Sequence, residues 1–204
     1  VHIYDNILTD LKDGGTFLLN TEWTEEELDK NLPAAMKRYL AEHNIKFYII
    51  DGTGIAAKIG LGNRINSVLQ AAFFKLANII PIDDAVKYMK EMIQKSYGKK
   101  GANIVAMNEA AVDAGVNNVH KVDYPASWAD VEDDAPAAKL VGRDKAHTDY
   151  LNGILVPTNT LTGDAVPVST FLDTANGMVP SGTAAYEKRG IATDVPVWNK
   201  ANCM

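Results

Sequence analysis

The first fifty residues alternate short apolar runs with segments whose apolar positions recur at helical spacing. Residues 16–20, Thr-Phe-Leu-Leu-Asn, follow two glycines and are too few for a helix, so they predict a buried strand. Residues 46–51 predict a second strand, and residues 24–44 between the two show helical spacing. Two strands joined through a helical segment predict a right-handed parallel crossover.

The helical segment between these strands has its own start and stop signals. Thr24 is followed three residues later by Glu27, which is the pattern of a capping box, and the acidic first turn suits the positive end of the helix dipole. Pro33 interrupts the segment, so it either kinks one helix or begins a second one. The sequence leaves both possibilities open.

Three longer helices are predicted after the second strand. Apolar residues at helical spacing predict a helix over residues 64–80, ended by Pro81, and we expect its apolar face to lie in the core. Residues 83–97 and 103–114 predict two further helices, and Gly98 is placed to cap the first of them.

The order of these elements predicts the fold class. Residues 119–122 add a brief strand, and we expect residues 1–129 to form an α/β domain, a three-layer α/β/α arrangement with a partial, mostly parallel sheet. From Asp130 onward the periodicity is lost: residues 130–136 are acidic, and the remainder is rich in Pro, Thr, Gly and Asn. We therefore expect residues 130–204 to form an irregular connector that follows the surface of a larger object.

Composition narrows the class of protein. Hydrophobic residues make up 47% and charged residues 23% of the chain, which suits a folded domain. The net charge of −6 argues against a nucleic-acid partner, because phosphate binding needs clustered Lys and Arg. No apolar run is long enough for a membrane span, and one cysteine cannot form an internal disulfide. We expect a cytoplasmic protein that contacts neither membrane nor nucleic acid.

Few residues have the spacing that catalysis or metal binding requires. The segment from Gly52 to Ala57, Gly-Thr-Gly-Ile-Ala-Ala, resembles a dinucleotide fingerprint, but neither a second strand nor an acidic residue follows at the required distance. We therefore interpret its glycines as turn residues. The histidines are scattered along the chain: His2, His43, His120 and His147. We predict no catalytic residue and no histidine metal site in this chain.

Arg64 and Asn66 form the most informative polar pair. They are placed in the first turn of a strongly apolar helix, where free backbone N–H groups and the helix dipole favour an anion. A guanidinium adds a bidentate donor for a phosphate or carboxylate. The competing interpretation is that Arg64 pairs with an acidic side chain and thereby fixes the helix.

Both ends of the sequence indicate a fragment. A helical pattern over residues 1–10 begins at Val1 without any preceding segment. At the other end, Cys203 is the only cysteine and precedes the final residue, Met204. Its position is that of the first ligand of an interrupted metal site.

Several long motifs, in a fixed order, resemble one family of enzymes. They cover nearly the whole chain apart from the stretch after Asp130: residues 14–20, 32–42, 60–77, 108–115, 122–129, 166–171 and 182–192. These motifs are similar to the gamma-type catalytic domain of pyruvate:ferredoxin (flavodoxin) oxidoreductases and to the connector that leads to a ferredoxin-like domain.

The resemblance implies a piece of a much longer enzyme of anaerobic metabolism. Such enzymes decarboxylate pyruvate on thiamine diphosphate with Mg²⁺, pass electrons through [4Fe-4S] clusters to ferredoxin or flavodoxin, and release acetyl-CoA. The implied partners are the remaining domains of the parent enzyme, coenzyme A, and ferredoxin or flavodoxin, and the implied parent is a homodimer. No complete cofactor site is implied for this chain, which we expect to be inactive alone.

The resemblance also implies roles for Cys203, Arg64 and Asn66. Cys203 corresponds to the first cysteine of a cluster-binding run, and a cubane needs four thiolates. Arg64 and Asn66 lie within a family motif and are candidate contacts to coenzyme A or to an adjoining domain. Two alternatives remain for the chain itself: a coenzyme A or nucleotide binding module, and a structural spacer without catalysis.

Overall fold

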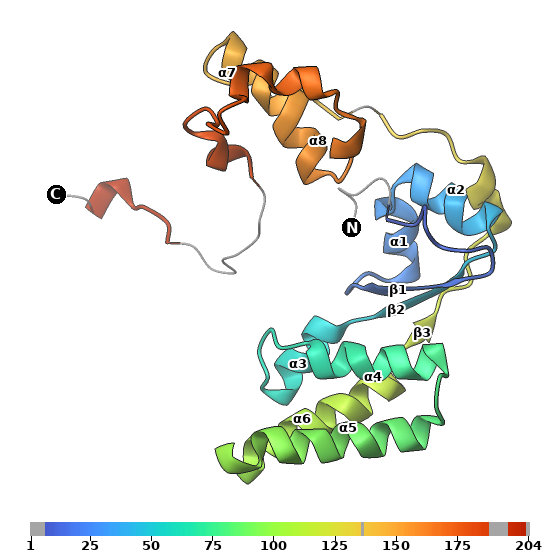
Figure 1. Ribbon diagram of the computed structural model, residues 1–204. Coiled ribbons are helices and arrows are strands. Elements are labelled where there is room, and N and C mark those ends of the chain that lie inside the picture. Colours follow the sequence, from blue (N-terminus) through green and yellow to red (C-terminus); the bar gives the residue numbers. More distant parts are fainter. Residues whose placement is uncertain (1–6, 136, 188–195, 203–204) are drawn as a thin grey trace. The chain divides into compact units, whose positions relative to one another are not determined.

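We analysed a computed structural model that describes residues 7–135, 137–187 and 196–202 (Figure 1). The chain divides between Ala135 and Pro136 into two compact units. The larger unit holds the sheet and the long helices, and the smaller unit holds the later, shorter helices. The helix expected over residues 1–10 lies mostly outside the described residues, and residues 7–10 form turns.

A three-stranded sheet lies at the centre of the larger unit. Its order is β1 (Thr16–Asn20), β2 (Lys46–Ile50) and β3 (His120–Lys121). β1 and β2 pair in parallel over five residue pairs, which confirms the parallel connection. β3 adds two antiparallel pairs, so the sheet is mixed. Phe47 on β2 is fully buried and marks the core.

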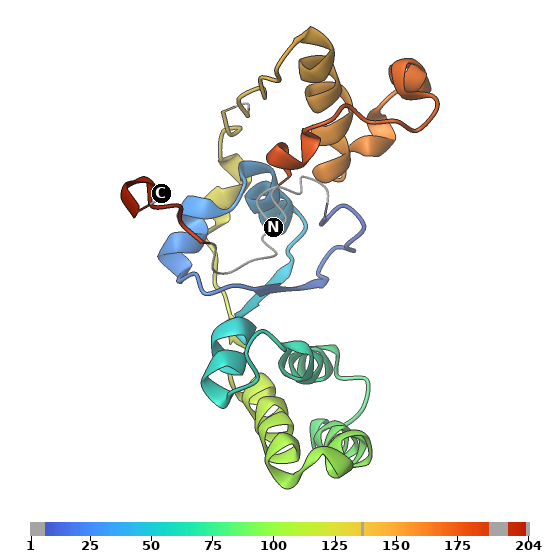
Figure 2. The ribbon, with the colours of Figure 1, turned by 90° about the vertical axis from the view of Figure 1, so that its left-hand side faces the viewer.

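Helices cover both faces of this sheet, which confirms the three-layer α/β arrangement. α1 (Glu25–Asn31) and α2 (Ala34–Glu42) lie on one side of the strands, and α3 (Gly52–Ile59) lies on the other with the three longer helices (Figures 1 and 2). Thr24 Oγ1 accepts the Glu27 N–H (3.3 Å), and Glu27 Oε2 accepts the Thr24 N–H (2.9 Å), so the capping box is confirmed. Pro33 precedes α2 and therefore begins a second helix.

The long helices follow the sequence pattern with shifted ends. They are α4 (Asn66–Ala77), α5 (Ile82–Tyr97) and α6 (Ala102–Asn117). α4 was expected to begin at Arg64, but Arg64 donates its N–H to Leu61 in a turn that precedes the helix. α4 also ends early, because Asn78 adopts a left-handed conformation with φ of 47°.

α4 and α6 approach each other closely. Gly115 of α6 is buried against α4, and a Cβ there would overlap the carbonyl oxygen of Val68 and lie 2.9 Å from the Cβ of Ala71. Ala72 and Ala111 are fully buried in the same region. Small side chains at these positions let the two helix backbones pack directly against each other.

The chain between β3 and the end of the larger unit packs on the α1 and α2 layer. The Tyr124 ring stacks on Trp128 with centroids 5.2 Å apart, and Trp128 Nε1 donates to Asp29 Oδ1 at 2.7 Å. The Tyr124 hydroxyl donates to the carbonyl oxygens of Leu40 and Ile45, and burial raises its pKa. This segment, one of the recognised motifs, therefore has a structural role in this domain.

The smaller unit contains a helix where an irregular connector was expected. α7 (Lys145–Tyr150) continues through a π-helical turn (Leu151–Leu155) into α8 (Val156–Asn159). Its apolar side buries Leu151 and Leu155, so residues 145–159 are helical within the segment that was expected to be an irregular connector. The sequence did not reveal this helix, because its buried apolar positions lie within only five residues, Leu151–Leu155, in a part of the chain that also contains prolines and threonines. Among the described residues of both units, the short 3₁₀ segments are Gly98–Lys100, Ala126–Asp130, Gly163–Ala165, Val168–Thr174, Thr183–Tyr186 and Lys200–Asn202.

His147 joins this helix to the later part of the smaller unit. It is 4% exposed, and its ring meets Tyr186 edge-on with centroids 5.7 Å apart. Its Nδ1 accepts the Arg143 N–H at 3.4 Å, so the proton of a neutral ring lies on Nε2. The Tyr186 hydroxyl donates to the Val141 carbonyl at 2.9 Å, which connects residues 183–187 to the segment before α7.

We predict that Gly115→Ala destabilises the larger unit by about 1–3 kcal/mol, because the added Cβ forces α4 and α6 apart. Urea unfolding followed by circular dichroism measures the change. Gly98→Ala is the matched control: its Cβ would meet nothing within 4 Å and its φ of −53° suits alanine. The control should be neutral or stabilising by up to about 1 kcal/mol. Equal effects of the two substitutions would contradict the close packing at Gly115.

We also predict a pH-dependent contribution from Asp144, whose carboxylate caps α7 by accepting the His147 N–H at 2.8 Å. This hydrogen bond lowers the Asp144 pKa, with a smaller contribution from Arg143. The stabilisation is therefore complete above the ordinary value of about 3.9 and is lost as pH falls through the lowered pKa.

The urea midpoint of the wild type should exceed that of Asp144→Asn near pH 6, because a carboxylate caps better than an amide next to Arg143. The difference should shrink below about pH 4, where the carboxylate becomes protonated. A difference between the two proteins that does not change with pH would show that the charge of Asp144 plays no part.

Candidate functional site

A short loop between α3 and α4 presents the candidate residues Arg64 and Asn66. Gly60 and Gly62 have φ angles of 94° and 61°, values that favour glycine, and they let the chain reverse direction within a few residues. Leu61 between them is 6% exposed and donates its N–H to the Ala56 carbonyl, which anchors the loop in the core. Arg64 and Asn66 are therefore exposed at a fixed turn.

The N-terminus of α4 is open. Ile65 occupies the capping position and has no side chain that could accept a hydrogen bond, so it caps none of the first N–H groups. Asn66 is the first helical residue, and Leu69 is the residue that donates back to the Ile65 carbonyl. Unfilled N–H groups at the positive end of a twelve-residue helix attract an anion.

Arg64 stands beside this helix end. Within residues 7–135 no ion pair or hydrogen bond of its guanidinium is found, so the expected alternative of an acidic partner has no support there. The structure brings Arg64 and Asn66 together at one helix end, although Arg64 precedes the helix rather than lying in its first turn. A guanidinium and several N–H groups in one place can bind a phosphate or a carboxylate.

Asn108 of α6 supports this helix end from inside the domain. Its side chain is almost buried; its Nδ2 donates to the Ile104 carbonyl at 2.8 Å, and its Oδ1 accepts from Ser67 Oγ at 3.5 Å. Ser67 lies in the first turn of α4, so the contact fixes the helix end that carries Asn66. The sequence analysis assigned no role to Asn108. The feature that could have identified it is a single amide side chain on an otherwise apolar helix face.

The glycines of the apparent dinucleotide fingerprint serve the protein's own backbone. The Gly52 N–H donates to Asn20 Oδ1 at 2.8 Å, and the Gly54 N–H donates to Asp51 Oδ1 at 2.7 Å. A Cβ at Gly54 would overlap the Asp51 carboxylate, so glycine is needed for this cap. Both glycines lie in the first turn of α3 rather than in a turn before it, and their N–H groups are already bonded within the protein.

The candidate metal ligand of this chain is its one cysteine. Cys203 lies outside the described residues, and the part of the chain that the structure describes holds no group of three or more His, Cys, Asp or Glu side chains that could bind a metal ion. A single cysteine supplies one of the four thiolates that a [4Fe-4S] cluster requires, so the chain alone does not fit such a cluster.

A membrane span requires a long, strongly apolar helix. None of the helices in the described part of the chain meets this requirement.

These observations define a class: an α/β domain with an open, positively charged helix end, followed by a smaller helical unit. The family model for pyruvate ferredoxin/flavodoxin oxidoreductase matches residues 1–118. A second model, for a domain of unknown function, matches residues 138–192, which covers most of the smaller unit. The chain belongs to the pyruvate ferredoxin/flavodoxin oxidoreductase family.

Individual relatives agree with this assignment. The chain is 50% identical over 199 residues to the pyruvate:ferredoxin oxidoreductase of Moorella thermoacetica, which covers 98% of the chain and 16% of that protein. It is 50% identical over 198 residues to the pyruvate-flavodoxin oxidoreductase of Enterobacter agglomerans, with 97% and 16% covered. It is 40% identical over 225 residues to the pyruvate dehydrogenase [NADP(+)] of Cryptosporidium parvum, with 100% and 12% covered. The chain thus spans about one sixth of the first two relatives.

Proposed function

We propose that this chain is a segment of an enzyme that oxidatively decarboxylates pyruvate. In the proposed reaction pyruvate and coenzyme A give acetyl-CoA, CO₂, a proton and two electrons, and ferredoxin or flavodoxin accepts the electrons. The observation that carries this proposal is the 50% identity to the Moorella enzyme across 98% of the chain. Identity at this level over several separate motifs supports a shared reaction in the whole protein.

The acceptor is set by other parts of the enzyme. The relatives' names include ferredoxin, flavodoxin and NADP⁺, although each aligns with nearly all of this chain. A segment shared by enzymes named for three acceptors has no evident part in choosing between them. We therefore place acceptor binding outside residues 1–204.

We further propose that the Arg64 and Asn66 helix end contacts coenzyme A. Coenzyme A carries phosphate groups, and the open N–H groups of α4 with the adjacent guanidinium suit a phosphate. The rigid loop at Gly60 and Gly62 and the Asn108 contact hold this end in place without a ligand. Pre-formed donors avoid the entropy cost of ordering on binding.

The remaining cofactors belong, on this proposal, to regions beyond this chain. Thiamine diphosphate with Mg²⁺ would supply the decarboxylation chemistry, and [4Fe-4S] clusters would carry single electrons. Cys203 is proposed as the first ligand of one such cluster, with its other thiolates lying in sequence beyond Met204. The parent enzyme is proposed to be a cytoplasmic homodimer.

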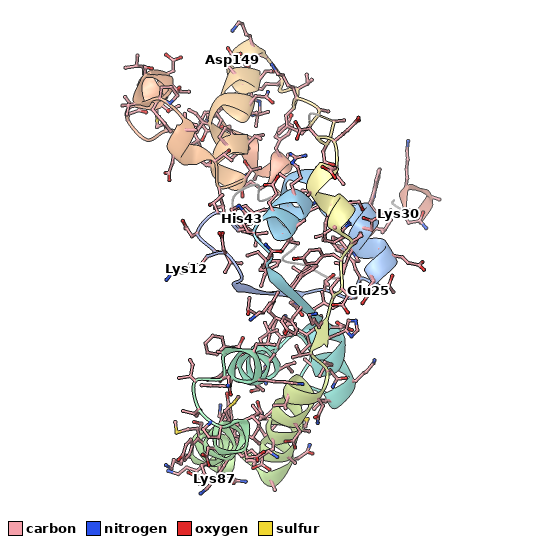
Figure 3. All side chains as sticks on the ribbon, turned by 90° about the vertical axis from the view of Figure 1, so that its right-hand side faces the viewer. Lys12, Glu25, Lys30, His43, Lys87 and Asp149 are labelled. Atoms are coloured by element: carbon pink, nitrogen blue, oxygen red, sulfur yellow. The ribbon has the colours of Figure 1, made fainter. Side chains whose placement is uncertain are left out.

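In the parent enzyme, Arg64→Ala should raise the KM for coenzyme A by about ten- to a hundred-fold, because the substitution removes a charge-assisted hydrogen bond to the coenzyme. The KM for pyruvate should not change, because only the coenzyme loses a contact. Lys87→Ala is the control, since it removes an exposed cation of α5 outside the site (Figure 3). An unchanged KM for coenzyme A would overturn the assignment of Arg64 while leaving the proposed reaction standing.

The isolated chain separates the three functional hypotheses. With pyruvate, thiamine diphosphate, coenzyme A and ferredoxin it should form no acetyl-CoA, and product formed by the chain alone would contradict its role as an incomplete segment. Calorimetric titration with coenzyme A distinguishes the other two hypotheses. Saturation by the wild type but not by Arg64→Ala supports a binding module, whereas no heat with either protein supports a structural spacer.

A further inference from the structure

A groove of about 400 Å³ runs between α4 and α5. Both helices pack on α6 but contact each other less, so their outer surfaces diverge. The α5 side of the groove extends from Ala85 to Tyr97, which corresponds to about 18 Å of helix. This length matches a helix of about twelve residues lying between α4 and α5.

The lining of this groove differs from the rest of the surface. None of its twelve lining residues is charged, although charged residues make up 23% of the chain. Phe74 and Met89 lie in it, and Tyr88 and Met92 are 53% and 57% exposed there. Aromatic residues and methionine are enriched, and charges depleted, at the centre of protein interfaces.

Charged residues flank the groove on the exposed face of α5. Glu91 and Lys95 are exposed and do not line it. Apolar lining beside charged residues is the arrangement of an interface core and its polar rim. Phe73, which is 51% exposed and meets Phe74 edge-on at 5.5 Å, extends the apolar surface over α4. A water-exposed surface of this kind is costly unless something covers it.

The length of the relatives identifies the class of occupant. The chain covers 16% of the Moorella relative, so most of the polypeptide in such a protein lies outside this segment. A segment of the same polypeptide has a high effective concentration at the groove, which a separate protein lacks. Two helices that diverge over a third leave the position that a fourth helix fills in a bundle.

We propose that a helix from another part of the parent polypeptide, outside residues 1–204, docks in the groove between α4 and α5. Its apolar side chains, spaced three and four residues apart, would contact Phe74, Tyr88 and Met92, and the Ser67 and Gln70 side chains would bond its polar groups. This inference rests on membership of a longer protein, and the groove shares one lining residue, Asn66, with the proposed coenzyme A contact.

Photo-crosslinking in the complete parent enzyme tests the proposal. A benzophenone amino acid in place of Tyr88 should crosslink to a helical peptide from outside residues 1–204, and the product should keep the mass of one chain on a denaturing gel. The same amino acid in place of the adjacent Lys87, which lies outside the groove, should give little of this product. Crosslinking to a second copy, to another protein or within residues 1–204, or no crosslinking at Tyr88, would overturn the proposal.

Oxidation of the unaltered enzyme gives a second measurement that needs no substitution. Met92 is more than half exposed in this chain, so hydrogen peroxide should oxidise it rapidly if the groove is open. In the native parent enzyme we expect oxidation of Met92 to be slowed about ten-fold or more relative to the urea-unfolded enzyme. Buried Met36 serves as the internal standard for a protected methionine. A native rate for Met92 close to the unfolded rate would show an open groove and contradict the docking of a helix.

Discussion

The direct packing of α4 on α6 is the constraint on which the larger unit depends. Gly115 leaves no side chain between the helices, so the Val68 backbone of α4 lies against α6. The same approach brings Ser67 to Asn108, which fixes the start of α4. Because α5 also rests on α6, the position of α6 determines both the open helix end and the groove between α4 and α5.

Two neighbouring helix starts, those of α3 and α4, differ in how their first N–H groups are capped. α3 begins at Asp51, whose carboxylate and the Asn20 amide accept the first N–H groups. α4 begins after Ile65, which has no polar side chain and therefore caps none of the first N–H groups. α3 begins directly after β2, whereas α4 follows the loop that contains Gly60 and Gly62, and the residue in the capping position decides which start has a side-chain cap.

Much of the larger unit could be predicted from sequence because its signals are local. The capping box at Thr24 and the two short apolar runs depend on residues close in the chain, and they gave the correct helix start and strands. The end of α4 could not be predicted, because an asparagine tolerates the left-handed conformation at Asn78 without requiring it. The role of Asn108 was hidden as well, because its partner Ser67 lies 41 residues away.

The smaller unit was harder to predict because its structure depends on side chains that form hydrogen bonds with backbone groups far away in the sequence. Asn152 exchanges two hydrogen bonds with the backbone of Leu140, which lies 12 residues earlier in the chain. His147 and Tyr186 join residues far apart in sequence in a similar way. Neither pattern has a periodic signature, so a segment that reads as irregular can still hold a small buried core. Composition alone is therefore a poor guide where single polar side chains organise the fold.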